Sequence, residues 1–123
     1  MGMFSIEVQV AHPTEQRFES IEALVDTGAT YTVLPATLLR SLGIQPHRTS
    51  EFELADGRVV EMQVGRALLR LGDQEEVTLV VFGEEGVAPL LGAVALEDFL
   101  LAADPIRGSL VPIPGLLRGL RLL

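Results

Sequence analysis

The chain has 123 residues and a formal net charge of −8, and 48% of its residues are hydrophobic while only 5% are aromatic, which fits one domain with an aliphatic core. The acidic charge argues against a nucleic-acid partner because it repels phosphates, and the absence of cysteine excludes disulfides, thiol nucleophiles and thiolate metal sites. No apolar run approaches the ~18 residues of a membrane span and no signal-peptide pattern opens the chain, so we expect a soluble cytoplasmic domain without a membrane span.

The first predicted elements are two strands and a helix. Apolar and polar side chains alternate from Phe4 to Val10, which is typical of a half-buried strand. After the turn-like stretch AHPTEQ, a second strand runs from Phe18 to Val25 and leads directly into Asp26. The stretch ATLLRSLG predicts a short helix, with Pro35 near its first turn and Gly43 as its stop.

The middle of the chain predicts further strands separated by glycine-containing turns. In EFELADGRVVEMQV, two alternating strands are joined at Asp56-Gly57. This dipeptide favours a tight hairpin because glycine accepts the positive φ that such turns require. More strand is expected in RALLRL and in EVTLVVFG, on either side of Gly72-Asp73.

The last third predicts a second helix and an edge segment. The helix is expected over about Val94 to Ala102, and its buried stripe is expected to consist of Val94, Leu96, Phe99 and Leu100. Pro112 and Pro114 confine any strand of the tail to an edge or an interface. The elements together predict an all-β, closed, barrel-like domain with two short helices.

Asp26 is the residue from which a function can be argued. A buried carboxylate costs several kcal/mol unless its charge is satisfied. In one solution, a tight loop directs the Gly28 N–H at the carboxylate while Thr27 anchors the turn. In the other, a second carboxylate lies opposite and the two share one proton, an arrangement that can activate water while it hydrogen-bonds a substrate carbonyl.

Three stretches together resemble one protein family. ALVDTGATYTVLP resembles the active-site loop of retropepsin-like aspartic proteases, in which apolar residues precede Asp-Thr-Gly-Ala. PLLGAVALEDFLL is similar to the family's second apolar-apolar-Gly element and main helix, with Leu90, Leu91 and Gly92 in the matching places. ELADGRVVEM lies where the family has its hairpin flap. The resemblance implies a retropepsin (acid protease) domain over residues 1–114, followed by a C-terminal tail over residues 115–123.

The resemblance also implies a role for each residue of the active-site loop. Asp26 would be the catalytic carboxylate, and Thr27 would hydrogen-bond across to its counterpart in a second loop. Gly28 would let the substrate backbone approach, and Ala29 would help to line the floor of the site.

Two further groups of residues would cover and support this loop. In the flap, the residues implied to cover a bound peptide are Ala55, Asp56, Gly57 and Arg58. Leu91 and Gly92 would support the loop from beneath. No metal and no cofactor is expected in such a site.

Each chain carries one Asp-Thr-Gly, so the second carboxylate must come from a second subunit across a two-fold axis. The resemblance therefore implies a homodimeric aspartic endopeptidase that cleaves peptides or proteins with water activated between two Asp26 side chains. The tail GLLRGLRLL is expected at the dimer interface, and a membrane-surface or partner-binding peptide is the alternative.

The sequence departs from the family in two places. Thr30 and Tyr31 follow Ala29 where the viral members usually have an acidic residue, and the flap tip Asp56-Gly57-Arg58 is charged. These departures leave an alternative function: a non-catalytic dimeric module on the same fold that binds peptides or regulates. A third interpretation is a structural domain in which Asp26 only caps a turn.

Overall fold

The computed structural model describes residues 3–84 and 86–121. Within these ranges the chain is mostly β with two short helices, as the sequence predicts. The elements in chain order are β1 Phe4–Ala11, β2 Glu19–Val25, β3 Thr32–Pro35, α1 Ala36–Ser41, β4 Arg48–Glu53, β5 Val59–Leu71, β6 Gln74–Gly83, β7 Leu90–Leu91, α2 Ala93–Asp98, β8 Leu101–Asp104 and β9 Ser109–Pro112.

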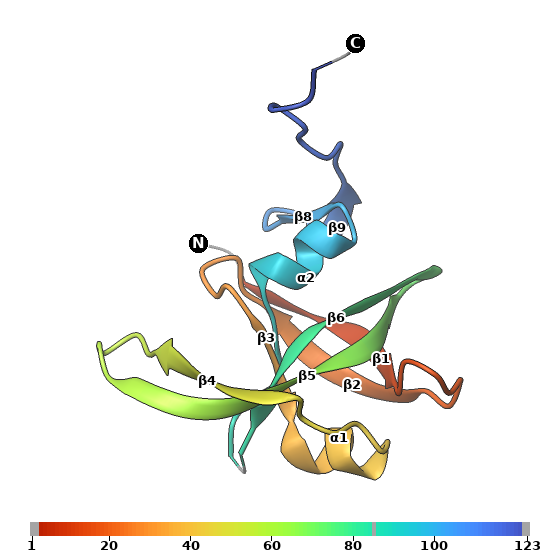
Figure 1. Ribbon diagram of the computed structural model, residues 1–123. Helices are drawn as coiled ribbons and strands as arrows, with labels where there is room; N and C mark the ends of the chain where they lie inside the picture. Colours follow the sequence, from red (N-terminus) through yellow and green to blue (C-terminus); the bar gives the residue numbers. More distant parts are fainter. Residues whose placement is uncertain (1–2, 85, 122–123) are drawn as a thin grey trace.

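Seven strands form one sheet in the order β1-β2-β7-β3-β6-β5-β4. β1 also pairs with β5, so the pairings of six strands run in a ring and β4 is left outside it. In Figure 1, the β4–β5 hairpin projects from one side of the molecule, while α2 and the separate β8–β9 sheet lie at the opposite end from α1.

The first two strands form as the sequence predicts. Val8 and Val10 are fully buried and Glu7 is exposed, in keeping with the alternating pattern. The antiparallel register pairs Phe4 with Val25. Asp26 therefore lies just beyond the end of the β1–β2 pair.

The stretch before the first helix contains a strand that the sequence analysis did not predict. Thr32–Pro35 forms β3, which pairs in parallel with β6 and antiparallel with β7. The predicted helix follows, with Pro35 as its N-cap residue and with Gly43 beyond its end at a φ of +78°. Glycine suits this left-handed conformation because it has no Cβ to clash.

The central strands are longer than their sequence patterns indicate. The segments predicted separately on either side of Gly65 form one continuous 13-residue strand, β5. Its first half pairs with β4 and its second half with β6. Gly57 and Gly72, at φ +88° and +63°, make the two predicted turns.

The second helix ends earlier than predicted. α2 stops at Asp98, and Leu100 adopts a φ of +53°, so the chain reverses before Ala102 and the next residues form β8. Leu100 is 50% exposed, so its expected place in the buried stripe is wrong, while Leu96 and Phe99 are buried.

The C-terminal part of the described chain begins with β9, which pairs only with β8 and is thus an edge strand, as the prolines predict. Residues 113–121 continue beyond it and lead away from the body of the molecule, with a turn in which the Leu120 N–H donates to the Leu117 carbonyl (Figure 1). Residues 122–123 of the predicted tail lie outside the described residues.

The core is aliphatic, as the composition predicts, apart from the two aromatic side chains of Phe82 and Phe99. Its largest fully buried residue is Phe82, on β6. None of the described helices is long and apolar enough to cross a membrane.

Candidate active site

The Asp26 carboxylate is held by the backbone of its own loop. β2 ends at Val25, which pairs in parallel with Leu91 of β7, and the Asp26 N–H donates to the Leu91 carbonyl at 3.1 Å. The Gly28 N–H donates to Asp26 Oδ1 at 2.9 Å, and the Ala29 N–H donates to the Asp26 carbonyl at 3.1 Å. The loop thus fixes one carboxylate oxygen and leaves the other available to a substrate, a water or a second carboxylate.

The segment after β7 crosses beneath this loop and is bonded to it. The N–H groups of Ala93 and Val94 donate to the carbonyls of Ala29 and Thr30 at 2.8 and 2.9 Å. The Gly92 N–H donates to the buried Thr32 hydroxyl oxygen at 3.1 Å. Residues that are some 60 positions apart in the chain therefore hold the loop in one place.

Gly92 lies too close to the loop for any side chain. A Cβ at this position would lie 2.6 Å from the carbonyl carbon and oxygen of Tyr31 and 2.9 Å from the Thr30 oxygen. Contacts this short with backbone atoms require the loop to move. The glycine therefore sets how closely the supporting segment approaches the loop.

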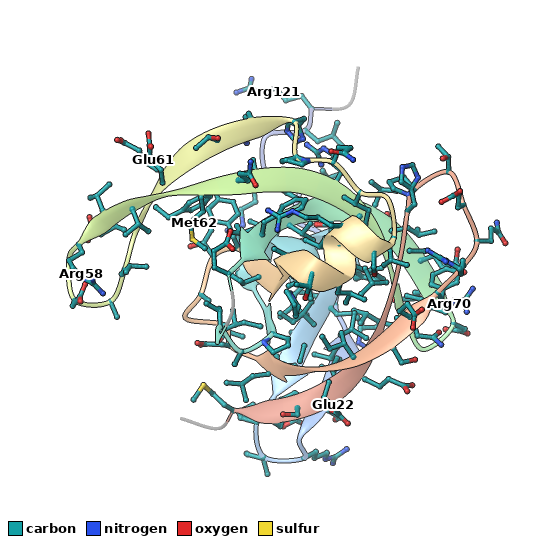
Figure 2. The ribbon with its side chains drawn as sticks, turned by 90° about the horizontal axis from the view of Figure 1, so that it is seen from below. Glu22, Arg58, Glu61, Met62, Arg70 and Arg121 are labelled. Atoms are coloured by element: carbon teal, nitrogen blue, oxygen red, sulfur yellow. The ribbon has the colours of Figure 1, made fainter. Side chains whose placement is uncertain are left out.

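A cleft of about 700 Å³ separates the Asp26 loop from the β4–β5 hairpin. Figure 2 shows the hairpin edge-on, with Met62 pointing toward the body of the molecule and Glu61 pointing away from it. The residues that line the cleft are Asp26, Gly28, Ala29, Thr30, Tyr31, Val33, Glu51, Phe52, Glu53, Leu54, Ala55, Met62, Val81 and Leu90. Its walls are mainly apolar, and three acidic residues also line it: Asp26 of the loop and Glu51 and Glu53 of β4.

The hairpin tip is organised by a contact between two of its own residues. The Arg58 N–H donates to Asp56 Oδ1 at 3.0 Å, and the Arg58 guanidinium contacts Asp56 Oδ2 at 2.8 Å. The backbone N–H and then the guanidinium of Arg58 lower the pKa of the Asp56 carboxyl below its ordinary value. Of the four residues expected to cover a peptide, only Ala55 lines the cleft, and Gly57 lies at the tip with the charged pair.

Not all four loop residues that the sequence analysis singled out line the cleft. Asp26, Gly28 and Ala29 line it, whereas the exposed Thr27 does not. Thr27 is thus free, within the described chain, to meet a group from another molecule.

Sequence reasoning missed the apolar wall of the cleft. Phe52 and Met62 were not singled out, yet they occupy inward positions of the two hairpin strands. The ring of Phe52 stands edge-on to that of Tyr31. The signal was present, because both residues alternate with exposed glutamates in strands that were predicted.

Comparisons with known proteins identify the family and the fold of the chain. Residues 17–98 match the protein family described as gag-polyprotein putative aspartyl protease. The chain belongs to this family. The resemblance to retropepsin-like proteases is therefore confirmed at the level of family and fold. A search of curated protein sequences gave no match.

Solved structures with a similar fold include proteins from viruses and from a eukaryotic parasite. The retroviral protease-like domain of Ddi1 from Leishmania major has a TM-score of 0.57 at 15% identity, with 91% of this chain and 89% of that chain covered. The EIAV protease bound to the inhibitor HBY-793 has a TM-score of 0.56 at 19% identity, covering 77% and 86%. The protease of simian foamy virus (mac) has a TM-score of 0.55 at 17% identity, covering 75% and 90%.

Proposed function

We propose that the protein is an aspartic endopeptidase that acts as a homodimer, with one Asp26 from each protomer. The observation that carries the proposal is the Asp26 carboxylate, which lies in a cleft with one oxygen fixed by the Gly28 N–H and is overhung by a hairpin. Membership of an aspartyl protease family and the similarity to protease folds support it.

The proposed reaction needs two facing carboxylates that hold one proton between them. The ionised Asp26 takes a proton from a water molecule, and the water oxygen bonds to the carbonyl carbon of the scissile peptide. The protonated Asp26 gives its proton to the carbonyl oxygen, which produces a tetrahedral diol. A proton then passes to the amide nitrogen, the C–N bond breaks, and the products are a carboxylic acid and an amine.

The homodimer follows from the number of carboxylates. Each protomer supplies one Asp26, and a two-fold axis is the symmetry that brings two identical loops together. The exposed position of Thr27 at the turn of the loop supports this arrangement, because its hydroxyl is available to the partner loop. The proposed substrates are extended peptides or protein segments, since the mainly apolar cleft lies between the loop and the hairpin, where an extended chain fits.

The experiment that tests the proposal is cleavage of a mixed peptide library at several pH values, with Asp26→Asn as the matched control. This substitution keeps the size of the side chain and its acceptor for the Gly28 N–H, but removes the carboxylate. Asp26-dependent cleavage is expected, with specific activity that falls when the protein is diluted. Cleavage that is equal in the variant would refute the assignment.

A second candidate function is a dimeric module on this fold that binds peptides without cutting them. The observation that favours it is the hairpin tip, where Asp56 and Arg58 contact each other and do not line the cleft. Peptide binding by both the parent and Asp26→Asn, with no cleavage by either, would support this function over the first.

A further inference from the structure

A second hollow lies outside the Asp26 cleft, between β1, the β5–β6 turn and the β8–β9 hairpin. Its volume is about 450 Å³, which falls within the range of roughly 300–1,000 Å³ that is typical of ligand pockets. The hollow and the cleft share no lining residue. It is therefore a separate surface feature, and the proposed chemistry does not use it.

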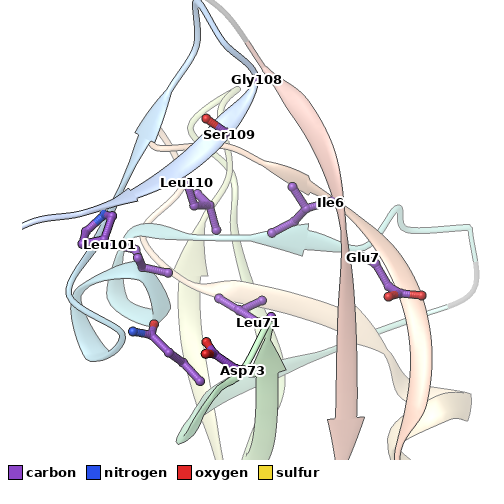
Figure 3. A pocket seen from close by; sticks show the side chains of 11 residues that line it. Ile6, Glu7, Leu71, Asp73, Leu101, Gly108, Ser109 and Leu110 are labelled. Carbon is purple, nitrogen blue, oxygen red and sulfur yellow. The ribbon is translucent and has the colours of Figure 1, made fainter.

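The floor of this hollow is apolar and comes from four different strands. Figure 3 shows the side chains that make it, which are Ile6 of β1, Leu71 of β5, Leu101 of β8 and Leu110 of β9. Leu71 is 7% exposed and the other three are half-buried. Apolar side chains left partly open at one place are typical of a surface that another apolar segment covers.

The charged groups around the hollow are acidic. Asp73 lies at its mouth, in the turn between β5 and β6 (Figure 3). Glu7 also borders it and is paired directly with Glu22 across the two strands, an arrangement of like charges that a cation would relieve. Arg107, in the β8–β9 turn, lies 3.9 Å from Asp104 instead. The lining residues themselves include no basic side chain.

The C-terminal tail is apolar and basic, which complements the apolar floor and the acidic mouth of the hollow. Leu116, Leu117 and Leu120 are 72%, 73% and 62% exposed, so the described structure leaves them uncovered. Arg118 and Arg121 stand among them, and the sequence contains no acidic residue after Asp104. A peptide of leucines and arginines matches an apolar hollow with an acidic mouth.

The path of the tail leads away from the hollow of its own chain. The Ile113 N–H donates to the Leu100 carbonyl at 3.0 Å, which carries the chain past the end of β8. Beyond that bond it extends outward from the body (Figure 1). The eight residues 114–121 can span at most about 26 Å when extended, which gives the tail the reach to contact a neighbouring molecule.

We propose that the tail of each protomer docks in this hollow of a second copy of the chain. Leucines of the tail would fill the apolar floor, and Arg118 and Arg121 would face Asp73. This inference rests on the homodimer of the proposed function and adds a second, reciprocal contact to it. The docking would cover apolar side chains that are exposed in the single chain.

Engineered cysteines test the contact directly, because the natural chain contains none. One preparation carries Asp73→Cys, and a second, enlarged by a fusion tag, carries Leu117→Cys, Arg118→Cys or Leu120→Cys. After mild oxidation of the mixture, we expect a disulfide between the two preparations for at least one tail position. Glu15→Cys, in an exposed turn away from the hollow, replaces Asp73→Cys as the matched control.

Two results would overturn the inference. One is a yield of mixed disulfide no higher than with Glu15→Cys. The other is a disulfide within a single chain when Asp73→Cys and a tail cysteine are combined in the same molecule, because the tail would then fold back on its own hollow.

Charge reversal provides an independent measurement. Arg118→Glu with Arg121→Glu is expected to raise the dimer dissociation constant by about 10-fold or more, and adding Asp73→Arg is expected to reverse most of that loss. Arg48→Glu with Arg66→Glu, at exposed positions that do not line the hollow, makes a control with the same change in net charge. If cleavage depends on Asp26 but the dimer dissociation constant does not change with these tail substitutions, the docking is refuted and the proposed function is not. A monomeric protein inactive at every concentration would refute the proposed function.

Discussion

The ring of Tyr31 meets the ring of Phe52 edge-on, with centroids 5.5 Å apart and an interplanar angle of 77°. Tyr31 follows Asp26 in the same loop, whereas Phe52 belongs to β4, the strand outside the ring of pairings. This contact therefore connects the loop that carries Asp26 to the hairpin that overhangs it. Any opening of the hairpin must separate the two rings.

The first prediction concerns this aromatic contact. In a double-mutant cycle with Tyr31→Leu and Phe52→Leu, we expect a coupling of about 1 kcal/mol in the free energy of unfolding, as measured for other edge-to-face pairs. Urea denaturation of the parent, the two single variants and the double variant gives this value. Tyr31→Leu combined with Phe4→Leu, in a strand that does not touch Tyr31, serves as control and should be additive. Additivity in both cycles would contradict the prediction.

The second prediction concerns the hairpin tip at low pH. The pKa of Asp56 is lowered by the Arg58 N–H and guanidinium, so the contact is formed at full strength above the ordinary carboxyl pKa. The contact is lost as the pH falls below about 4 and then through the lower pKa that the Asp56 carboxyl has in the folded protein. An NMR titration should show the Arg58 amide and guanidinium signals moving in this range. In Asp56→Asn these signals should not move there, and a titration midpoint above the ordinary carboxyl value would be inconsistent with the structure.

The third prediction concerns Gly92, the glycine beneath the Asp26 loop. Gly92→Ala should reduce the free energy of unfolding by at least about 2 kcal/mol, because the added methyl would overlap the Tyr31 carbonyl. Gly119→Ala is the matched control, since a Cβ there meets nothing within 4 Å. Its effect should stay within about 0.5 kcal/mol. Chemical denaturation of both variants measures their free energies of unfolding. Equal values would contradict the prediction, because they would mean that the loop moves to accommodate the methyl group at no cost.

The fourth prediction concerns the stoichiometry of the site. If each active unit needs two carboxylates, a dimer that contains one Asp26→Asn subunit is inactive. Equal amounts of parent and variant, mixed and allowed to exchange, should give about a quarter of the activity of the same total concentration of parent. A residual activity of one half would mean that each protomer acts alone. Parent protein diluted with an unrelated protein controls for inhibition by added protein.

Much of the fold follows from local patterns in the chain. Alternation from Phe4 to Val10 predicted β1, and the glycines at 57 and 72 predicted both hairpin turns at their observed positions. These elements could be predicted because their signals lie within about ten residues. β3 escaped prediction because Thr32–Pro35 is too short to show a period, and its partners, β6 and β7, come from far along the chain.

The end of α2 could not be predicted from the sequence for a different reason. The apolar pattern continues past Asp98, and no glycine or asparagine marks a stop. The structure reverses the chain at Leu100, in a left-handed conformation that leucine rarely adopts. Pairing of β8 with β9 decides this reversal, and a helical period does not reveal such a tertiary contact.

Part of the candidate site could likewise be predicted from local sequence, and part could not. Asp26 and Gly92 could be singled out from the sequence because each lies in a short motif of the chain. The contact of Tyr31 with Phe52 could not, since it depends on how the hairpin folds over the loop. The contact between Asp56 and Arg58, two residues apart, is local, yet its separation from the cleft is visible only in three dimensions.

β7 has only two residues, but it lies between β2 and β3 and receives the Asp26 N–H. Leu90 and Leu91 follow the loop by more than sixty positions, so closing this contact is a slow, non-local step of folding. During synthesis, the loop has no support until the ribosome has released the chain past Gly92. A growing polypeptide therefore cannot hold the Asp26 loop in place until this last third of the domain has emerged.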